Sequence, residues 1–167
     1  MEFISSDTNI WIDFYIIQQL ELPFRLPYKY LMSEDAMKDE LISPPDLSNE
    51  LISYGLMPIE ITIDEFFLAE SYANYYKKLS KYDRIALSIA KERNILLLTG
   101  DKALRQAAKQ ESVRFMGTLG IFDELWGQKL IDKDEYVSCL QQLFNNSGNL
   151  IRIPKDEIIS RLKKLLL

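Results

Sequence analysis

The sequence predicts an α/β fold: a three-layer α/β/α sandwich on a mainly parallel central sheet, with a helical extension at its C-terminal end. Two observations predict it. Short apolar segments alternate along the chain with longer amphipathic segments, as in strands joined by crossover helices. Residues 95–99, ILLLT, are almost continuously apolar, which is typical of a strand buried on both faces of a parallel sheet.

The elements can be followed in order from the N-terminus. Residues 2–6, EFISS, form a short strand-like run that ends in a polar cluster, and residues 8–22 then space their apolar side chains at nearly helical intervals. Residues 28–33 repeat the strand pattern. The next helix, residues 33–43, has Ser33 as its N-cap and acidic residues in its first turn, and it stops before two prolines.

The later elements continue this alternation. Residues 44–55 predict a short helix, and residues 56–62 predict the third strand. Two consecutive helices precede the apolar strand at residues 95–99, and three elements follow it, the middle one being an edge strand. These helices and the edge strand cover residues 64–79, 80–94, 100–111, 113–117 and 118–130.

The last part of the chain, residues 131–167, predicts a helical hairpin made of residues 132–146 and 154–167. We expect this extension to pack on the domain formed by residues 1–130. A chain of 167 residues that is 47% hydrophobic is long enough for one substantial core and too short for two full domains. The sequence therefore predicts one compact domain with a helical extension.

Composition excludes several kinds of site. The sequence contains no histidine, which excludes Ser-His and Cys-His nucleophile pairs as well as histidine metal ligands. Its one cysteine, Cys139, cannot form an internal disulfide or a clustered thiolate site. Any chemistry must therefore use carboxylates, hydroxyl groups, Lys, Arg or a hard metal ion.

Charge and hydropathy bear on partners and location. The formal net charge of −5 argues against a surface that is basic throughout, although it allows a local basic rim that binds phosphates. The sequence has no apolar run of about eighteen residues, and its start lacks a basic segment followed by a long apolar stretch. We therefore expect a cytoplasmic protein without a membrane partner.

Acidic residues stand where the predicted strands meet the predicted helices. Asp7 follows the first strand, Asp101 follows the most apolar strand, and Asp83 lies in the first turn of the helix before that strand. Ligand sites of parallel sheets lie beyond the carboxyl ends of the strands, where the crossover helices also pass. We therefore expect these three carboxylates at one edge. Glu40 joins them only if its helix leans over the sheet, because it lies about two turns into that helix.

Each acid also has a purely structural interpretation. Asp7 and Asp101 are placed to cap the helices that follow them, and Asp83 can complete a capping arrangement with Ser80. Glu40 suits a solvated helix surface. Three carboxylates at one edge repel one another, however, and such a cluster usually persists because a cation neutralises it.

The available ligands favour a hard metal ion. In a protein without histidine, an all-oxygen site is typical of Mg²⁺ or Mn²⁺ rather than Zn²⁺ or Cu²⁺. Ions of this kind support the hydrolysis of phosphodiesters. The sequence therefore predicts phosphoryl-transfer chemistry.

Four motifs resemble those of PIN-domain nucleases. SSDTNIWIDF, residues 5–14, is similar to the opening motif of the family, and MKDEL, residues 37–41, to its second acidic element. Residues 79–109, LSKYDRIALSIAKERNILLLTGDKALRQAAK, resemble the third and fourth motifs together. GTLGIFDEL, residues 117–125, is similar to a segment of some bacterial members. The resemblance covers about residues 2–126.

The resemblance implies a PIN fold whose acidic pocket binds Mg²⁺ or Mn²⁺ and cleaves RNA. Asn9 and Thr99 resemble the polar residues that support such a pocket. Many small bacterial members are toxins that an antitoxin protein holds inactive, often as dimers, so an antitoxin and a homodimer join RNA as candidate partners. Carried over by position, the catalytic and metal-binding acids would be Asp7, Glu40, Asp83 and Asp101.

Two assignments within this site stay open. Glu40 has Asp39, Asp35 and Glu34 as neighbours, so one of these carboxylates could be the second acid of the site instead. Four basic residues flank the acids and could hold RNA phosphates, although they equally suit an ordinary charged helix surface. They are Lys81, Arg84, Lys102 and Arg105.

Two other functions also stay open. A catalytically silent PIN-like module would bind RNA or a protein partner, but the presence of all four acids argues against it. A phosphatase of the haloacid-dehalogenase type also begins with Asp after its first strand. That chemistry needs a second Asp two residues later, where this chain has Asn9.

Overall fold

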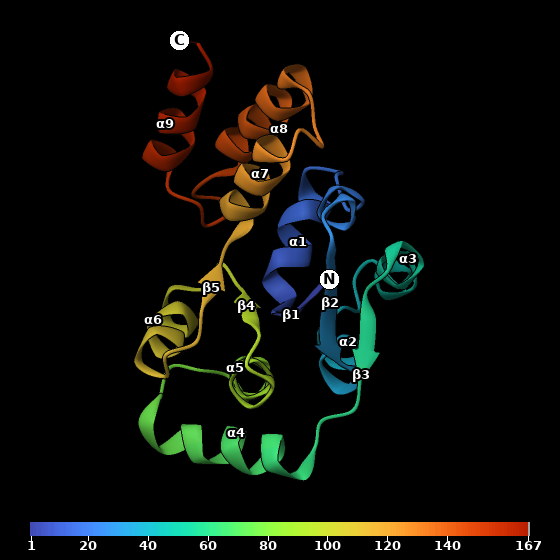
Figure 1. Ribbon diagram of the computed structural model, residues 1–167, viewed down its shortest axis with the longest axis vertical. Helices are drawn as coiled ribbons and strands as arrows, with labels where there is room; N and C mark the ends of the chain where they lie inside the picture. The colour runs from blue at the N-terminus through green and yellow to red at the C-terminus, as the bar shows by residue number, and fades with distance from the viewer. Residues whose placement is uncertain (167) are drawn as a thin grey trace.

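The computed structural model describes residues 1–166, so the last residue of the predicted extension, Leu167, lies outside the described residues. Within them a five-stranded sheet runs in the order β3-β2-β1-β4-β5, and all of its strand pairs are parallel (Figure 1). This arrangement confirms the predicted α/β/α class and the edge position of the last strand. The strands are β1 (Glu2–Ser6), β2 (Tyr28–Ser33), β3 (Met57–Ile59), β4 (Leu96–Leu98) and β5 (Phe115–Met116).

Helices connect these strands and cover both faces of the sheet. The first half of the chain contains α1 (Thr8–Ile16), the 3₁₀ helix η1 (Leu22–Arg25), α2 (Glu34–Glu40), α3 (Leu47–Tyr54) and α4 (Ile63–Tyr75). The second half contains α5 (Lys81–Arg93), α6 (Lys102–Gln110), α7 (Thr118–Gly127), α8 (Lys133–Asn146) and α9 (Lys155–Leu165). None of the helices within residues 1–166 has the length and apolar character needed to cross a membrane.

Several predicted boundaries differ from the structure, and two of the differences have a clear physical cause. The first helix ends at Ile16 rather than at residue 22, because Gln18 adopts a positive φ of 57° that a right-handed helix cannot contain. The third strand is limited to Met57–Ile59, and it contains Pro58, which has no amide hydrogen to donate to a neighbouring strand. A strand with this defect is suited to the sheet edge, where β3 lies.

Alternating side chains along β4 separate two hydrophobic cores. Leu98 is buried in the larger core with Ile4 of β1 and Phe14 of α1. Leu97 points to the opposite face of the sheet and is buried with Leu87 of α5 and Leu104 of α6. Figure 1 shows α5 lying between the strands and α4. The sheet is therefore covered on both faces, as a parallel sheet requires.

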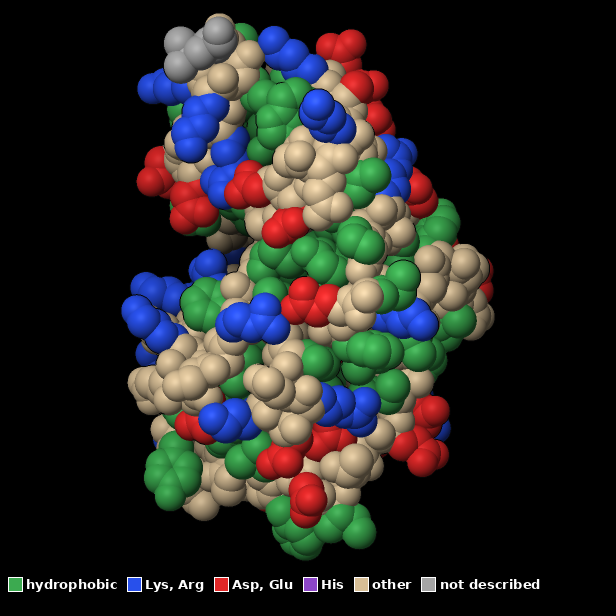
Figure 2. Space-filling view, in the orientation of Figure 1, with side chains coloured by type: hydrophobic (Ala, Val, Ile, Leu, Met, Phe, Trp, Pro, Cys, Tyr) green, Lys and Arg blue, Asp and Glu red, His purple; other side chains and the backbone are tan. Residues whose placement is uncertain are grey.

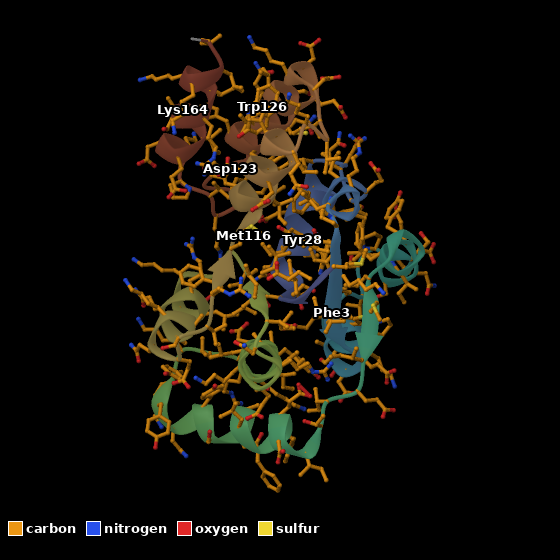
Figure 3. The ribbon with its side chains drawn as sticks, viewed as in Figure 1. Phe3, Tyr28, Met116, Asp123, Trp126 and Lys164 are labelled. Atoms are coloured by element: carbon orange, nitrogen blue, oxygen red, sulfur yellow. The ribbon has the colours of Figure 1, made fainter. Side chains whose placement is uncertain are left out.

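The C-terminal helices α8 and α9 pack on α7 and continue the larger core, in which Ile158 of α9 is fully buried. Asp123 and Trp126 of α7 lie on the side of that helix that meets α8 and α9 (Figure 3). Asp123 Oδ2 accepts a hydrogen bond from Arg161 Nη2 at 2.7 Å, and the Trp126 ring stacks on Tyr136 with 5.4 Å between centroids. This packing brings the connection between α8 and α9 back toward the sheet.

Candidate active site

Asp7 lies at the junction of β1 and α1, where the strand pattern breaks. Its extended backbone, with φ −85° and ψ 150°, makes it the N-cap of α1, and its Oδ1 accepts a hydrogen bond from the Thr8 amide at 2.9 Å. Its Oδ2 accepts a second hydrogen bond from Thr99 Oγ1, also at 2.9 Å. Only 4% of Asp7 is exposed. The carboxylate is thus held inside the protein at the carboxyl edge of the sheet.

Thr99 joins Asp7 to Asp101. It follows β4, the neighbour of β1 in the sheet, and it is fully buried. While its hydroxyl group donates to Asp7, the same oxygen accepts a hydrogen bond from the Asp101 amide at 3.1 Å. Asp101 Oδ1 in turn caps α6 by accepting from the Leu104 amide at 2.8 Å. One threonine therefore fixes the relative positions of two of the predicted acids.

Asp83 is held by a capping box at the start of α5. Its Oδ2 accepts a hydrogen bond from the Ser80 amide at 2.9 Å, and Ser80 Oγ accepts one from the Asp83 amide at 3.1 Å. The helix itself is fastened to β1, because Ser5 Oγ donates to the Ala86 carbonyl at 2.8 Å. These contacts set Asp83 beside the sheet edge that carries Asp7.

Glu40, the last residue of α2, contacts the residue that follows Asp7. Thr8 Oγ1 donates a hydrogen bond to Glu40 Oε1 at 2.6 Å. The neighbouring Asp39 instead accepts a hydrogen bond from the Tyr82 hydroxyl of α5. The two adjacent carboxylates are therefore distinguished by their partners, and Glu40 is the one tied to the Asp7 junction.

The charges of these acids act on one another. Burial raises the pKa of Asp7 to about 7, with a further rise from Asp83 and a smaller one from Glu40, against the lowering effect of the Thr99 hydrogen bond. Burial also raises the pKa of Asp83, and the charge of Asp101 contributes in the same direction. None of the five ion pairs within residues 1–166 includes one of the four acids. Their negative charge is thus uncompensated by these pairs.

The donor set fits a hard cation held by few protein ligands. Among the described residues, no three Asp, Glu or Cys side chains lie close enough to hold one ion together. Mg²⁺ is commonly bound by only one or two carboxylates, with water and substrate phosphates completing its shell. Asp83 and Asp101 each use one carboxylate oxygen for capping, which leaves the other oxygen available to a cation. The residues therefore fit Mg²⁺ or Mn²⁺ by chemistry and charge.

The structural interpretation of these acids is also correct. Asp7, Asp83 and Asp101 all accept a hydrogen bond from a backbone amide at the start of a helix. Capping does not require burial or mutual repulsion, however, since caps at solvated helix ends are common. The raised pKa of Asp7 is the feature that capping leaves unexplained.

The predicted basic residues differ in their surroundings. Arg84 donates to the backbone carbonyl groups of Ala69 and Ser80, at 3.3 and 3.4 Å, and so bridges α4 and α5. Lys81 lies over the Tyr82 ring, 5.4 Å from its centroid. Lys102 is exposed at the start of α6.

The other two polar residues predicted for the site, Arg105 and Asn9, line cavities near it. Arg105 is half-buried and lines a hollow beside β5. Asn9 is exposed and lines a cleft together with Asp101.

Two residues near the acids are additional to the sequence-based prediction. Thr8 positions Glu40, and Asp13 of α1 accepts a hydrogen bond from Thr118 Oγ1 at 2.9 Å. Burial raises the pKa of Asp13 to about 6, although Thr118 and the charge of Arg152 lower it. The signal for Asp13 is its position as a charged residue within the apolar run of α1. Thr8 has no comparable signal, because its role depends on how α2 lies.

The arrangement of this fold is shared with a solved structure, a PilT N-terminus domain protein from the hyperthermophilic archaeon Sulfolobus solfataricus P2. The similarity has a TM-score of 0.51 at 16% identity and covers 71% of this chain and 89% of that chain, which establishes a common fold. Among curated proteins, none matches the sequence.

A family model described as PIN domain matches residues 3–165. The chain therefore belongs to the PIN domain family, whose members are generally nucleases. This confirms the resemblance inferred from the motifs. The match also includes α8 and α9, which lie beyond those motifs.

Proposed function

We propose that this protein is a Mg²⁺- or Mn²⁺-dependent ribonuclease that hydrolyses the phosphodiester bonds of RNA. One observation carries the proposal: Asp7 is buried at the carboxyl edge of the sheet, and this burial, together with the charges of Asp83 and Glu40, raises its pKa to about 7. Membership of the PIN family supports nuclease chemistry at this edge. The RNA substrate and the metal dependence are the proposed specifics.

Each acid has a role in the proposal. One or two of Asp7, Asp83 and Asp101 would bind the cation directly, and the remaining carboxylate would act through water ligands of the cation. Glu40 adds negative charge on the side of Thr8. A bound Mg²⁺ or Mn²⁺ would stabilise the charge that develops on the phosphate during hydrolysis. Thr99 holds Asp7 and Asp101 in fixed positions relative to each other, so that the two carboxylates need not move when substrate binds.

A catalytically silent binding module explains the site less well. Burying a carboxylate next to other carboxylates makes its charged form unfavourable, and this destabilises the protein at neutral pH. Active sites commonly retain such arrangements because function requires them. An antitoxin partner and a homodimer stay predictions of the family resemblance, and a cytoplasmic location stays a prediction of the hydropathy pattern.

The test is cleavage of a labelled single-stranded RNA by the purified protein, with Mn²⁺ or with a chelator. We expect cleavage only with the ion, and loss of cleavage in Asp7→Asn and Asp101→Asn. Asp64→Asn is the matched control, since it makes the same charge change at an exposed position at the start of α4. Circular dichroism establishes that each variant is folded.

Two results would contradict the proposal. Cleavage by folded Asp7→Asn and Asp101→Asn proteins at the wild-type rate would exclude the acidic centre as its origin. Metal-dependent hydrolysis of a simple phosphomonoester, with RNA left intact, would instead favour a phosphatase. Asn9 argues against that outcome, since it stands where a phosphatase of the haloacid-dehalogenase type needs its second Asp.

A further inference from the structure

A cleft of about 160 Å³ opens beside the acidic centre. Its lining includes Asn9 and Asp13 of α1, Asp101 at the start of α6, and Leu150 and Arg152. The last two residues belong to the connection between α8 and α9. The C-terminal part of the chain thus supplies a wall to a cavity that contains a proposed catalytic acid.

A larger hollow of about 320 Å³ continues from this cleft. The two cavities share Gly100, Arg152 and Ile153, so they meet at the connection between α8 and α9. Figure 2 shows the surface hollowed between α6 and α9, with Lys and Arg side chains gathered on the α6 side. The two cavities are therefore contiguous, and Asp101 is part of their combined lining.

Two arginines supply positive charge to this combined lining, which also contains the carboxylates of Asp13, Asp101 and Glu157. Arg105 of α6 lines the larger hollow, and Arg152 lines both cavities. The five ion pairs within residues 1–166 leave both side chains without a carboxylate partner. Asp13 lies near enough to Arg152 for the positive charge to lower the pKa of its carboxyl group. Both arginines are therefore available to bind an anion.

Arg161 differs from these two residues, although it also lines the hollow. Its Nε and Nη2 atoms donate to the two carboxylate oxygens of Asp123, at 2.8 and 2.7 Å. This bidentate pair holds α9 against α7. It uses two N–H groups of the guanidinium that would otherwise be able to bind a phosphate.

Apolar side chains lie between the charged ones. Phe115 is 40% exposed at the hollow, and Ile153 and Leu119 line it nearby. Grooves that bind single-stranded nucleic acid combine positive charge for the backbone with aromatic faces on which bases stack. An acidic peptide would also pair with the arginines, but its binding would not explain why the same cavities contain the proposed catalytic acid Asp101.

We propose that the two cavities form one groove for single-stranded RNA, in which Arg105 and Arg152 bind backbone phosphates next to the acidic centre. The inference rests on the proposed function, because the RNA is placed next to Asp101 on the assumption that Asp101 takes part in cleavage. It adds a role for the C-terminal helices, which hold Arg152 at the mouth of the site. Since phosphate contacts position a nucleic acid without reading its sequence, the groove predicts affinity rather than base specificity.

The test measures binding separately from cleavage. The full chain is titrated into a fluorescently labelled single-stranded RNA in the presence of a chelator, and anisotropy is followed at several salt concentrations. We expect Arg152→Ala and Arg105→Ala each to weaken binding about five- to tenfold and to lower the slope of log K against log salt by about 0.7. Arg152→Lys keeps the charge and is expected to retain most of the affinity.

Arg114→Ala is the matched control. It makes the same charge change on an exposed side chain whose partner, Glu2, begins β1 at the opposite edge of the sheet. We expect its affinity for RNA to equal that of the wild type. An equal loss of RNA affinity in Arg114→Ala would show that removing any positive charge weakens binding, and it would contradict the proposed groove.

Two further outcomes separate this inference from the proposed function. Wild-type affinity in both Arg105→Ala and Arg152→Ala would refute the groove even if the protein cleaves RNA. Arg152-dependent binding of poly-glutamate but not of RNA would overturn it in favour of an acidic protein partner. If Asp7→Asn binds RNA in an Arg152-dependent manner while the wild type cleaves nothing, the groove stands and the proposed ribonuclease activity fails.

Discussion

Thr99 Oγ1 donates a hydrogen bond to Asp7 Oδ2 at 2.9 Å while it accepts one from the Asp101 amide at 3.1 Å. The hydroxyl group therefore links the ends of two adjacent strands, β1 and β4, at the point where each supplies an acidic side chain. Because Thr99 is fully buried, no water competes for either bond.

Replacement of Thr99 by valine tests this link. Thr99→Val keeps the shape of the side chain but removes both hydrogen bonds, and we expect RNA cleavage to fall about 10- to 100-fold, as for other residues that orient metal ligands. Thr99→Ser retains the hydroxyl group and should keep most of the activity. Steady-state cleavage rates with Mn²⁺ provide the measurement, and equal rates for the valine and serine variants would exclude a positioning role.

The raised pKa of Asp7 predicts an unusual dependence of stability on pH. An unfolded Asp titrates near pH 3.9, whereas burial and then the charge of Asp83 hold the pKa of Asp7 at about 7 in the folded protein. Between these values the folded chain keeps a proton that the unfolded chain has lost, so this group makes stability fall as pH rises from about 4 to about 7.

Asp7→Asn removes that dependence. In the metal-free protein we expect the variant to be more stable than the wild type by about 2–4 kcal/mol at pH 8, and the difference to disappear near pH 4. Urea unfolding at a series of pH values measures it. A difference that stayed constant across the series would mean that Asp7 does not titrate as described.

Glu40 and Asp39 are adjacent carboxylates with different predicted effects. Thr8 holds Glu40 beside the Asp7 junction, whereas Asp39 accepts a hydrogen bond from Tyr82. We expect Glu40→Gln to lower cleavage at least about tenfold and Asp39→Asn to change it less than about threefold. The two variants make the same charge change one residue apart, so cleavage assays of the pair test the register directly. The reverse order of effects would assign the site to Asp39.

A buried ion pair away from the site predicts a purely structural effect. Glu65 is 1% exposed in α4, and its Oε2 lies 3.0 Å from Arg93 Nε of α5. Burial alone would raise the pKa of Glu65, but the hydrogen bonds and charge of Arg93, together with Thr62, lower it overall. Removing Arg93 therefore leaves a buried carboxylate uncompensated.

We expect Arg93→Ala to lower the free energy of unfolding by about 3 kcal/mol at pH 7. Arg114→Ala removes an exposed pair with Glu2 and should cost less than about 1 kcal/mol. Chemical denaturation compares the two. Because the pKa of Glu65 is lowered, the pair stabilises the protein above the usual pKa of a glutamate, and the effect of Arg93→Ala should shrink as pH falls below that value. Similar losses in the two variants would contradict this interpretation.

The fold was predictable because its pattern is local. The order of strands and helices follows from the spacing of apolar side chains, and the apolar run ILLLT identifies a strand inside the sheet rather than at its edge. The end of α1 was not predictable in this way. Gln18 adopts a left-handed conformation, and only the surrounding packing determines which non-glycine residue will do so.

The candidate site was predictable only in part, for a related reason. Topology brings the ends of parallel strands to one edge, which is why Asp7, Asp83 and Asp101 could be grouped from the sequence. The contact between Thr8 and Glu40 depends on the tilt of α2, and the position of Arg152 depends on how a C-terminal hairpin docks. Neither has a periodic signal. Long-range packing determines both.

The hydrogen bond between Asp7 and Thr99 joins residues 92 positions apart, and the one between Thr8 and Glu40 spans 32. During synthesis the first of these cannot form until β4 has emerged and paired with β1, since contacts distant in the chain close late. The wall that contains Leu150 and Arg152 emerges later still. A growing chain therefore carries its first acidic residue from the start but has no assembled centre until most of the protein has been translated.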